Sequence, residues 1–140
     1  MHPLVQKEIM TAAHLDRLAL VTHLLSPEAF SSFAMLGDEA ADVDVLITSW
    51  GCPPLDTQAL DLCPRLKLIA HMAGSVKGFI DDAAWRRGIR VVNAAAAGAI
   101  PVAQYTVAAI LFANKQVFDL NRFYMDYREN RAPWTQEAPG

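Results

Sequence analysis

A chain of 140 residues has room for one compact domain. Hydrophobic residues make up 53% of the sequence and charged residues 19%, a globular rather than a disordered composition. The net charge of −3 offers no basic surface for nucleic acid, and Cys52 and Cys63 lack the spacing of a zinc or redox pair.

The start of the chain has no basic region followed by an apolar run, so no secretory signal is indicated. The most apolar stretch, residues 102–113, is shorter than the roughly 20 residues that span a bilayer. We therefore expect a cytoplasmic protein that binds neither membranes nor nucleic acid.

Four short apolar runs predict β-strands, over residues 18–24, 43–48, 66–72 and 89–93. Nearly continuous aliphatic strands of this kind are typical of a parallel sheet that is covered on both faces. The helices predicted around them cover residues 4–14, a segment beginning at Ser26–Pro27, residues 55–62 and residues 82–87. This alternation indicates an α/β domain.

Two of these helices carry recognisable end signals. Ser26 can cap a helix that has Pro27 at its first position. Asp81 can cap the helix over residues 82–87, and Gly88 is the expected left-handed stop.

A long helix is predicted from Pro101 to about Asn130, because residues 102–130 contain neither glycine nor proline. Its first half is apolar nearly all round, which predicts burial. A helix of this length outgrows the domain, so we expect it to dock against a second domain or another copy of the chain. Residues 131–140 are predicted to be a loop or linker.

Several segments in the middle of the chain resemble one enzyme family. They are Asp44–Thr48, Leu55–Leu60, Cys63–Ile69, Ala73–Val76, Gly88–Asn93 and Val102–Thr106. In this order and spacing they resemble the D-isomer-specific 2-hydroxyacid dehydrogenases.

The resemblance implies a flavodoxin-like parallel sheet with flanking helices, whose central strand comes first. Residues 1–3 leave no room for that strand before the first predicted helix, so either a different segment takes its place or the sequence begins late. Without the central strand, its two neighbours would have unpaired edges. The implied division is an incomplete substrate-side α/β domain over residues 1–100. Residues 101–140 would be the long interdomain helix and linker toward an absent cofactor domain.

The loop over residues 73–76 follows a predicted strand, and ligands of open parallel sheets bind at the carboxyl ends of strands. Small residues let backbone N–H groups approach an anion closely. The resemblance implies that Ala73, Gly74, Ser75 and Val76 bind the substrate carboxylate. The residues alone leave open that Gly74 merely makes a tight turn.

Other positions around the predicted cleft have two interpretations. Trp50 follows the preceding strand and either packs in the fold or borders the substrate. His71 is the histidine best placed for the cleft, although a lone strand histidine is usually a packing residue. The resemblance implies that Ile100 and Val102 border the nicotinamide of the cofactor, and Gln104 stands where the family has a glutamate.

The implied function is that of the N-terminal portion of an NAD- or NADP-dependent oxidoreductase, which transfers hydride between a D-2-hydroxy acid and its 2-oxo acid. The sequence has no Gly-x-Gly-x-x-Gly motif, and the family's catalytic arginine, acid and histidine belong to the cofactor domain. We therefore predict no catalytic residue, no bound cofactor and no activity for this chain alone, and a homo-oligomer.

The alternative is a stand-alone, dimeric carboxylate-binding module without catalysis, in which the long helix forms the dimer. A receiver-like signalling domain is disfavoured, because Thr48–Trp50 stands where such a domain needs a phosphorylatable aspartate.

Overall fold

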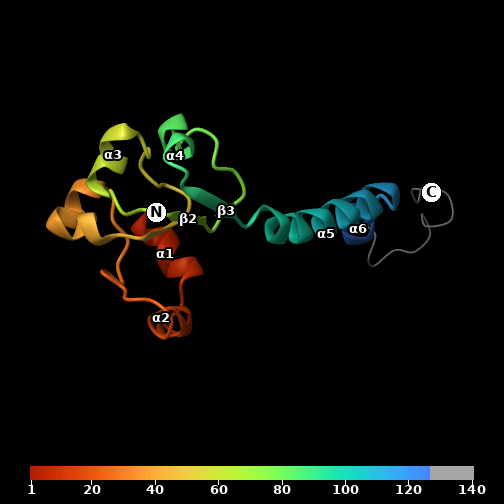
Figure 1. The fold of residues 1–140 in the computed structure, drawn as a ribbon. Coiled ribbons are helices and arrows are strands. Elements are labelled where there is room, and N and C mark those ends of the chain that lie inside the picture. The colour runs from red at the N-terminus through yellow and green to blue at the C-terminus, as the bar shows by residue number, and fades with distance from the viewer. Residues whose placement is uncertain (127–140) are drawn as a thin grey trace. The chain divides into compact units, whose positions relative to one another are not determined.

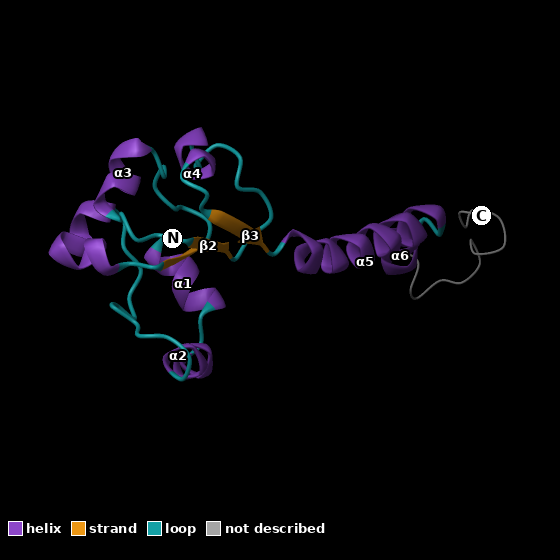
Figure 2. Cartoon of the chain, in the orientation of Figure 1, coloured by secondary structure: helices purple, strands orange, loops and turns teal. Residues whose placement is uncertain are grey.

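A computed structural model describes residues 1–126 of the protein (Figure 1). The contacts between residues divide the chain into two compact units. The first is Met1–Ala96, and the second begins at Ala97. The first unit contains the sheet, and the second is built from helices (Figure 2).

The sheet of the first unit has three parallel strands in the order β1-β2-β3. Its strands are β1 (Val45–Thr48), β2 (Leu68–His71) and β3 (Arg90–Asn93). These three strands confirm the predictions over residues 43–48, 66–72 and 89–93, and with the flanking helices they agree with a flavodoxin-like α/β fold.

Two short helices connect the strands. In α3 (Thr57–Leu62) the Asp56 carboxylate accepts a hydrogen bond from a backbone N–H of the first turn. In α4 (Asp82–Arg86) Asp81 does the same, as predicted. Gly88 has a φ of +70°, the left-handed conformation expected of a residue that stops a helix.

The hydrophobic core lies between the sheet and these helices. Leu55, Leu60 and Ile69 are completely buried within it. The remaining buried members are Leu36, Ala40, Val43, Ala59, Cys63, Leu66, Ala83, Ala84 and Ile89. The predicted cover of both faces of the sheet does not extend to β3, because most of this strand is exposed and Val92 is 52% exposed.

The predicted strand over residues 18–24 is wrong. The first two residues of this segment, Leu18 and Ala19, belong to helix α2 (Ala12–Ala19), and residues 20–24 are in no strand. Leu20 is 84% exposed. An apolar run becomes a strand only where a partner strand accepts its backbone hydrogen bonds, and none lies beside this one.

The helix predicted over residues 4–14 is divided into α1 (Pro3–Ile9) and α2. Met10 is extended between them, and Thr11 donates its N–H to the His14 ring at the start of α2. The periodicity alone predicts a single continuous helix here, whereas this local hydrogen bond lies at the start of a second helix.

The helix predicted from Ser26 is absent, because the Ser26 hydroxyl accepts the Glu28 N–H and closes a turn instead. The next helical segment is η1 (Phe33–Asp42), a 3₁₀ helix with Ser32 as its cap. Gly37, with a φ of +53°, interrupts its helical geometry.

The outer edge of β1 pairs with no strand within residues 1–126. The Asp44 and Thr48 carbonyls accept hydrogen bonds from the β2 side. Because backbone groups alternate along a strand, those of Val45 and Ile47 face the open edge. The unpaired edge predicted from the sequence is therefore present.

The second unit consists of α5 (Ala95–Asn114) and α6 (Val117–Asp126). The predicted start at Pro101 is wrong, because α5 begins at Ala95 and contains Pro101. The predicted single helix is also wrong: Gln116, with a φ of +49°, separates α5 from α6. Residues 127–130 of the predicted helix, and the linker, lie outside the described residues.

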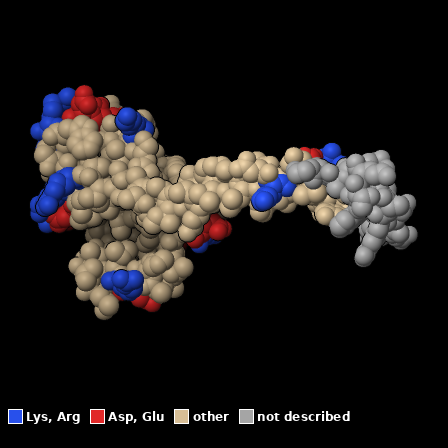
Figure 3. Space-filling view, turned by 90° about the vertical axis from the view of Figure 1, so that its right-hand side faces the viewer, with Lys and Arg blue, Asp and Glu red and all other residues tan. Residues whose placement is uncertain are grey.

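Helix α5 contains no charged residue, and none of its residues is buried in this chain (Figure 3). Its predicted burial against a second domain or another copy of the chain stays a prediction. The helix has 20 residues, and an 18-residue window within it has a mean hydropathy of 1.6, so it is long and apolar enough to cross a membrane by length and composition alone. A core helix of a soluble protein can meet the same criterion, so this property does not by itself identify a membrane span.

Candidate functional site

Polar side chains occupy the carboxyl ends of all three strands. The strand register places Thr48, His71 and Asn93 side by side across the sheet. Thr48 and His71 are buried, whereas Asn93 is exposed and accepts the Ala95 N–H at the start of α5. Ligands of open parallel sheets bind outside this edge.

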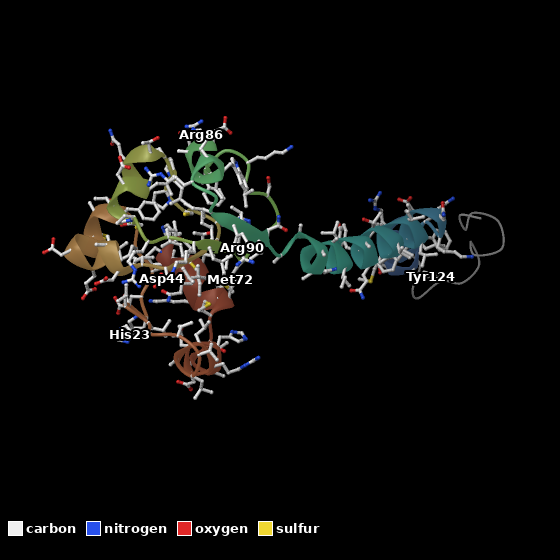
Figure 4. All side chains as sticks on the ribbon, in the orientation of Figure 1. His23, Asp44, Met72, Arg86, Arg90 and Tyr124 are labelled. Carbon is white, nitrogen blue, oxygen red and sulfur yellow. The ribbon has the colours of Figure 1, made fainter. Side chains whose placement is uncertain are left out.

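The loop Ala73–Val76 follows β2 at this edge and begins directly after Met72 (Figure 4). Within the described residues, none of its four consecutive N–H groups donates to a protein acceptor. The Ala73 carbonyl accepts the Ala94 N–H at 3.0 Å, which ties the loop to the end of β3. The loop is thus anchored through the Ala73 carbonyl, and its N–H groups have no protein partner; Ala73 is buried, whereas Gly74 and Ser75 are exposed.

Gly74 distinguishes the two interpretations of this loop. Its φ is not in the left-handed region, so a tight turn does not require glycine here. A Cβ atom at this position would meet nothing within 4 Å. The structure therefore does not require glycine at this position for a turn or for close packing, and the anion-binding interpretation depends on the unpaired amides of the loop.

His71 joins the strand end to the loop. Its Nδ1 lies 3.0 Å from the Thr48 Oγ1, and its ring centroid lies 4.8 Å from that of Phe79. Burial lowers the pKa of His71, a hydrogen bond to the Ser75 backbone opposes this, and the N-terminal ammonium lowers it slightly. The neutral imidazole is favoured.

This lowered pKa predicts a stability that depends on pH. The unfolded chain protonates His71 as the pH falls through about 6.5, while the folded chain resists protonation until lower pH. The unfolded state then binds more protons, so the free energy of unfolding should fall as the pH drops from about 7.5 to about 5.5. Urea unfolding across this range should show the fall, and it should be smaller in His71→Gln. An equal fall in both proteins would refute this assignment.

The sequence of this chain was compared with known families and proteins. A profile of the D-isomer specific 2-hydroxyacid dehydrogenase catalytic domain matches residues 5–138. The chain belongs to this dehydrogenase family. No curated protein matches the chain at a significant level.

In this dehydrogenase chain, Trp50 follows β1 at the same sheet edge as the loop. Its carbonyl accepts the His2 N–H at 3.0 Å, and 61% of the residue is exposed. Nothing in these contacts assigns the indole to substrate, so its predicted role stays a prediction. The neighbouring Ser49 was missed as a candidate: it is 1% exposed, and its hydroxyl has no hydrogen-bond partner among the described residues.

The other predicted residues divide between the two units. Ala73, Gly74, Ser75 and Val76 lie together in the first unit, as consecutive loop residues. Ile100 and Val102 lie on α5, exposed, in the second unit. Their predicted contact with nicotinamide stays a prediction.

A cavity of about 590 Å³ lies beside the open edge of β1 and not at the loop. It is mainly apolar, and the charged side chains that line it are Glu28, Asp42 and Asp44. Asp42 and Asp44 are already paired with Arg65 and Lys67, and the lining contains no lysine or arginine to bind a carboxylate, so the cavity does not suit the substrates of this family.

The described residues offer little other chemistry. They contain no cluster of metal-ligating side chains. Burial raises the pKa of Cys52, which the N-terminal ammonium opposes, and burial also raises the pKa of Cys63. Both thiols therefore stay protonated at neutral pH and are poor nucleophiles.

Proposed function

We propose that the loop Ala73–Val76 binds the carboxylate of a D-2-hydroxy acid or its 2-oxo acid, as the substrate-side part of an NAD- or NADP-dependent dehydrogenase. The observation that carries this proposal is the run of four consecutive N–H groups without a protein acceptor. They lie at the carboxyl end of β2, and the chain belongs to a 2-hydroxyacid dehydrogenase family.

The charge of the loop supports an anionic ligand. Lys77 is the only charged residue between positions 72 and 80, and it has no ion-pair partner among the described residues. Successive amides form a concave anion site, and a nearby ammonium adds Coulomb attraction. No carboxylate within the loop opposes this charge.

The residues present do not fit a dinucleotide cofactor. None of the seven glycines forms a Gly-x-Gly pair, the feature that lets a backbone approach a pyrophosphate. NAD or NADP accepts or donates the hydride in this reaction class. We propose that residues outside this chain hold it, and that the chain alone does not oxidise NADH. No step through the cofactor is derived from these residues.

Gly74→Ala tests the carboxylate site. An added methyl group on this loop should crowd a carboxylate bound to the neighbouring amides and weaken binding of glycolate about tenfold or more, a loss on the order of 1.4 kcal/mol. Titration by ¹H–¹⁵N NMR should show shifts at residues 73–76 with glycolate. Glycolamide, which lacks the carboxylate charge, should produce smaller shifts.

Gly98→Ala is the matched control. Its added Cβ would also meet nothing within 4 Å, but it lies on α5 and should leave glycolate binding unchanged. Binding of glycolate and glycolamide with equal affinity, or full binding by Gly74→Ala, would count against the proposal.

The predicted homo-oligomer and cytoplasmic location stay predictions. The exposed, uncharged surface of α5 supports an oligomer, since such a helix is usually covered by another protein surface.

A further inference from the structure

Lys77 begins the turn that follows the loop Ala73–Val76, and it differs from the loop residues in both its backbone and its side chain. Its N–H donates to the Ser75 Oγ at 3.3 Å, so the run of unpaired N–H groups ends at Val76. Its side chain is exposed and forms no ion pair among the described residues. The residue therefore offers a positive charge, and not a further amide, beside the loop.

Contacts on both sides hold the backbone of Lys77 next to the loop. The hydrogen bond to Ser75 joins it to the loop, and two residues span at most about 7 Å of chain. On the other side, the Phe79 carbonyl accepts the Leu55 N–H at 2.6 Å. Ile80 forms a parallel bridge with Leu55, which is completely buried. Both ends of the turn are thus attached to the fold, while the flexible four-carbon stem lets the ammonium adjust to a ligand on the loop.

No neighbouring carboxylate neutralises this charge within residues 1–126. Asp81 and Asp82 are the next acidic residues along the chain, and neither forms an ion pair with Lys77. Asp81 accepts the Ala83 N–H instead, at the start of α4. Other cations of the first unit do have carboxylate partners, namely Arg65, Lys67 and Arg87. The Lys77 ammonium is therefore available to a ligand.

The loop and the lysine together offer more donors than one carboxylate can use. A carboxylate accepts roughly four hydrogen bonds, and four consecutive N–H groups of the loop lack a protein acceptor. An ammonium adds three donors and attracts carboxylates and phosphates as a point charge. Since the amides can hold the first carboxylate, the ammonium is left for a second anionic group on the same ligand.

We propose that Lys77 binds a second anionic group of the substrate, a carboxylate or a phosphate, so that the site prefers dianionic 2-hydroxy or 2-oxo acids. This inference rests on the proposed function of the loop and names the substrate class of the same site. Lys77 determines specificity in this proposal, and no chemical step is assigned to it.

The full chain is titrated by ¹H–¹⁵N NMR with D-malate and with the derivative of D-malate whose second carboxyl group is an amide. The derivative keeps the size and the first carboxylate of D-malate but lacks the second charge. We expect D-malate to bind about fivefold more tightly, the gain expected of one exposed ion pair. A third ligand has a phosphonate in place of the second carboxyl group, and the tighter of the two dianions identifies the group that the ammonium prefers.

Substitutions of two lysines separate a local contact from an effect of net charge. Lys77→Met removes the ammonium and keeps most of the side-chain length, so the preference for the dianion should disappear. Lys77→Arg keeps the charge and should keep the preference. Lys67→Met is the matched control, because Lys67 directly precedes β2 and lies at the opposite end of that strand from the loop. Its ion pair with Asp44 is exposed, so its loss should leave the fold and the preference unchanged.

Equal affinity of the unaltered chain for the amide and for both dianions would overturn the assignment, as would a preference that survives in Lys77→Met. A loss of preference in Lys67→Met as large as in Lys77→Met would overturn it too, because net charge would then explain both. Glycolate separates this inference from the proposed function: shifts at residues 73–76 with glycolate, without a preference for either dianion, contradict only the role of Lys77. If none of these ligands shifts residues 73–76, the proposed function is wrong and the role of Lys77 with it.

Discussion

Replacing Ile69 by alanine should lower the free energy of unfolding by about 2–5 kcal/mol. Ile69 is completely buried in the central strand, β2, and packs in the cluster between the sheet and its helices. Its truncation removes apolar contacts and leaves a cavity that the neighbouring strands are poorly placed to fill. Since small domains are stable by only about 5–15 kcal/mol, this is a large fraction of the total.

Urea unfolding followed by circular dichroism measures the effect. Val92→Ala is the control, because Val92 lies in β3 and is about half exposed. Its midpoint should change much less than that of Ile69→Ala. Similar shifts of the unfolding midpoint in the two variants would contradict the burial of Ile69 in the hydrophobic core.

The second large effect is expected in α3. Leu60→Ala should also cost about 2–5 kcal/mol, because Leu60 is completely buried. Leu62→Ala, two residues later on the same helix, should cost well under 1 kcal/mol, because that side chain is partly exposed. Both substitutions replace leucine by alanine on the same helix, and the two sites differ in burial. The difference in thermal stability between the two variants therefore measures the effect of burial.

An equal loss in the two leucine variants would contradict the orientation of α3. The Arg87 guanidinium donates to the Leu60 carbonyl at 2.8 Å, a contact that both substitutions leave in place. A difference between them therefore reports the side chains and not this backbone contact.

The successful predictions depend on local chemistry. Asp81 and Gly88 were identified as helix cap and helix stop, and both have those roles. A carboxylate beside free N–H groups, or a glycine in a left-handed conformation, acts within a few residues of itself. The three confirmed strands also follow from local apolar runs, each pairing with a neighbour in the sheet.

The wrong predictions concern segments whose state depends on distant partners. Residues 18–24 are as apolar as the true strands but have no strand edge beside them, and α2 takes in their first two residues. The burial predicted for α5, against a second domain or another copy of the chain, depends on a distant partner in the same way and stays a prediction. An apolar composition indicates that a segment can be buried, but it does not identify the surface that would bury it.

At the candidate site, too, some features follow from the local sequence and others depend on distant parts of the fold. The position of the loop Ala73–Val76 follows from the local sequence, because a small-residue segment after an apolar run marks a strand end. That its amides are unpaired, and that His71 packs against Thr48 and Phe79, follows only from the fold. The reason is physical: a hydrogen-bond donor is available only if no other part of the fold accepts from it, and that depends on every neighbour brought there by folding.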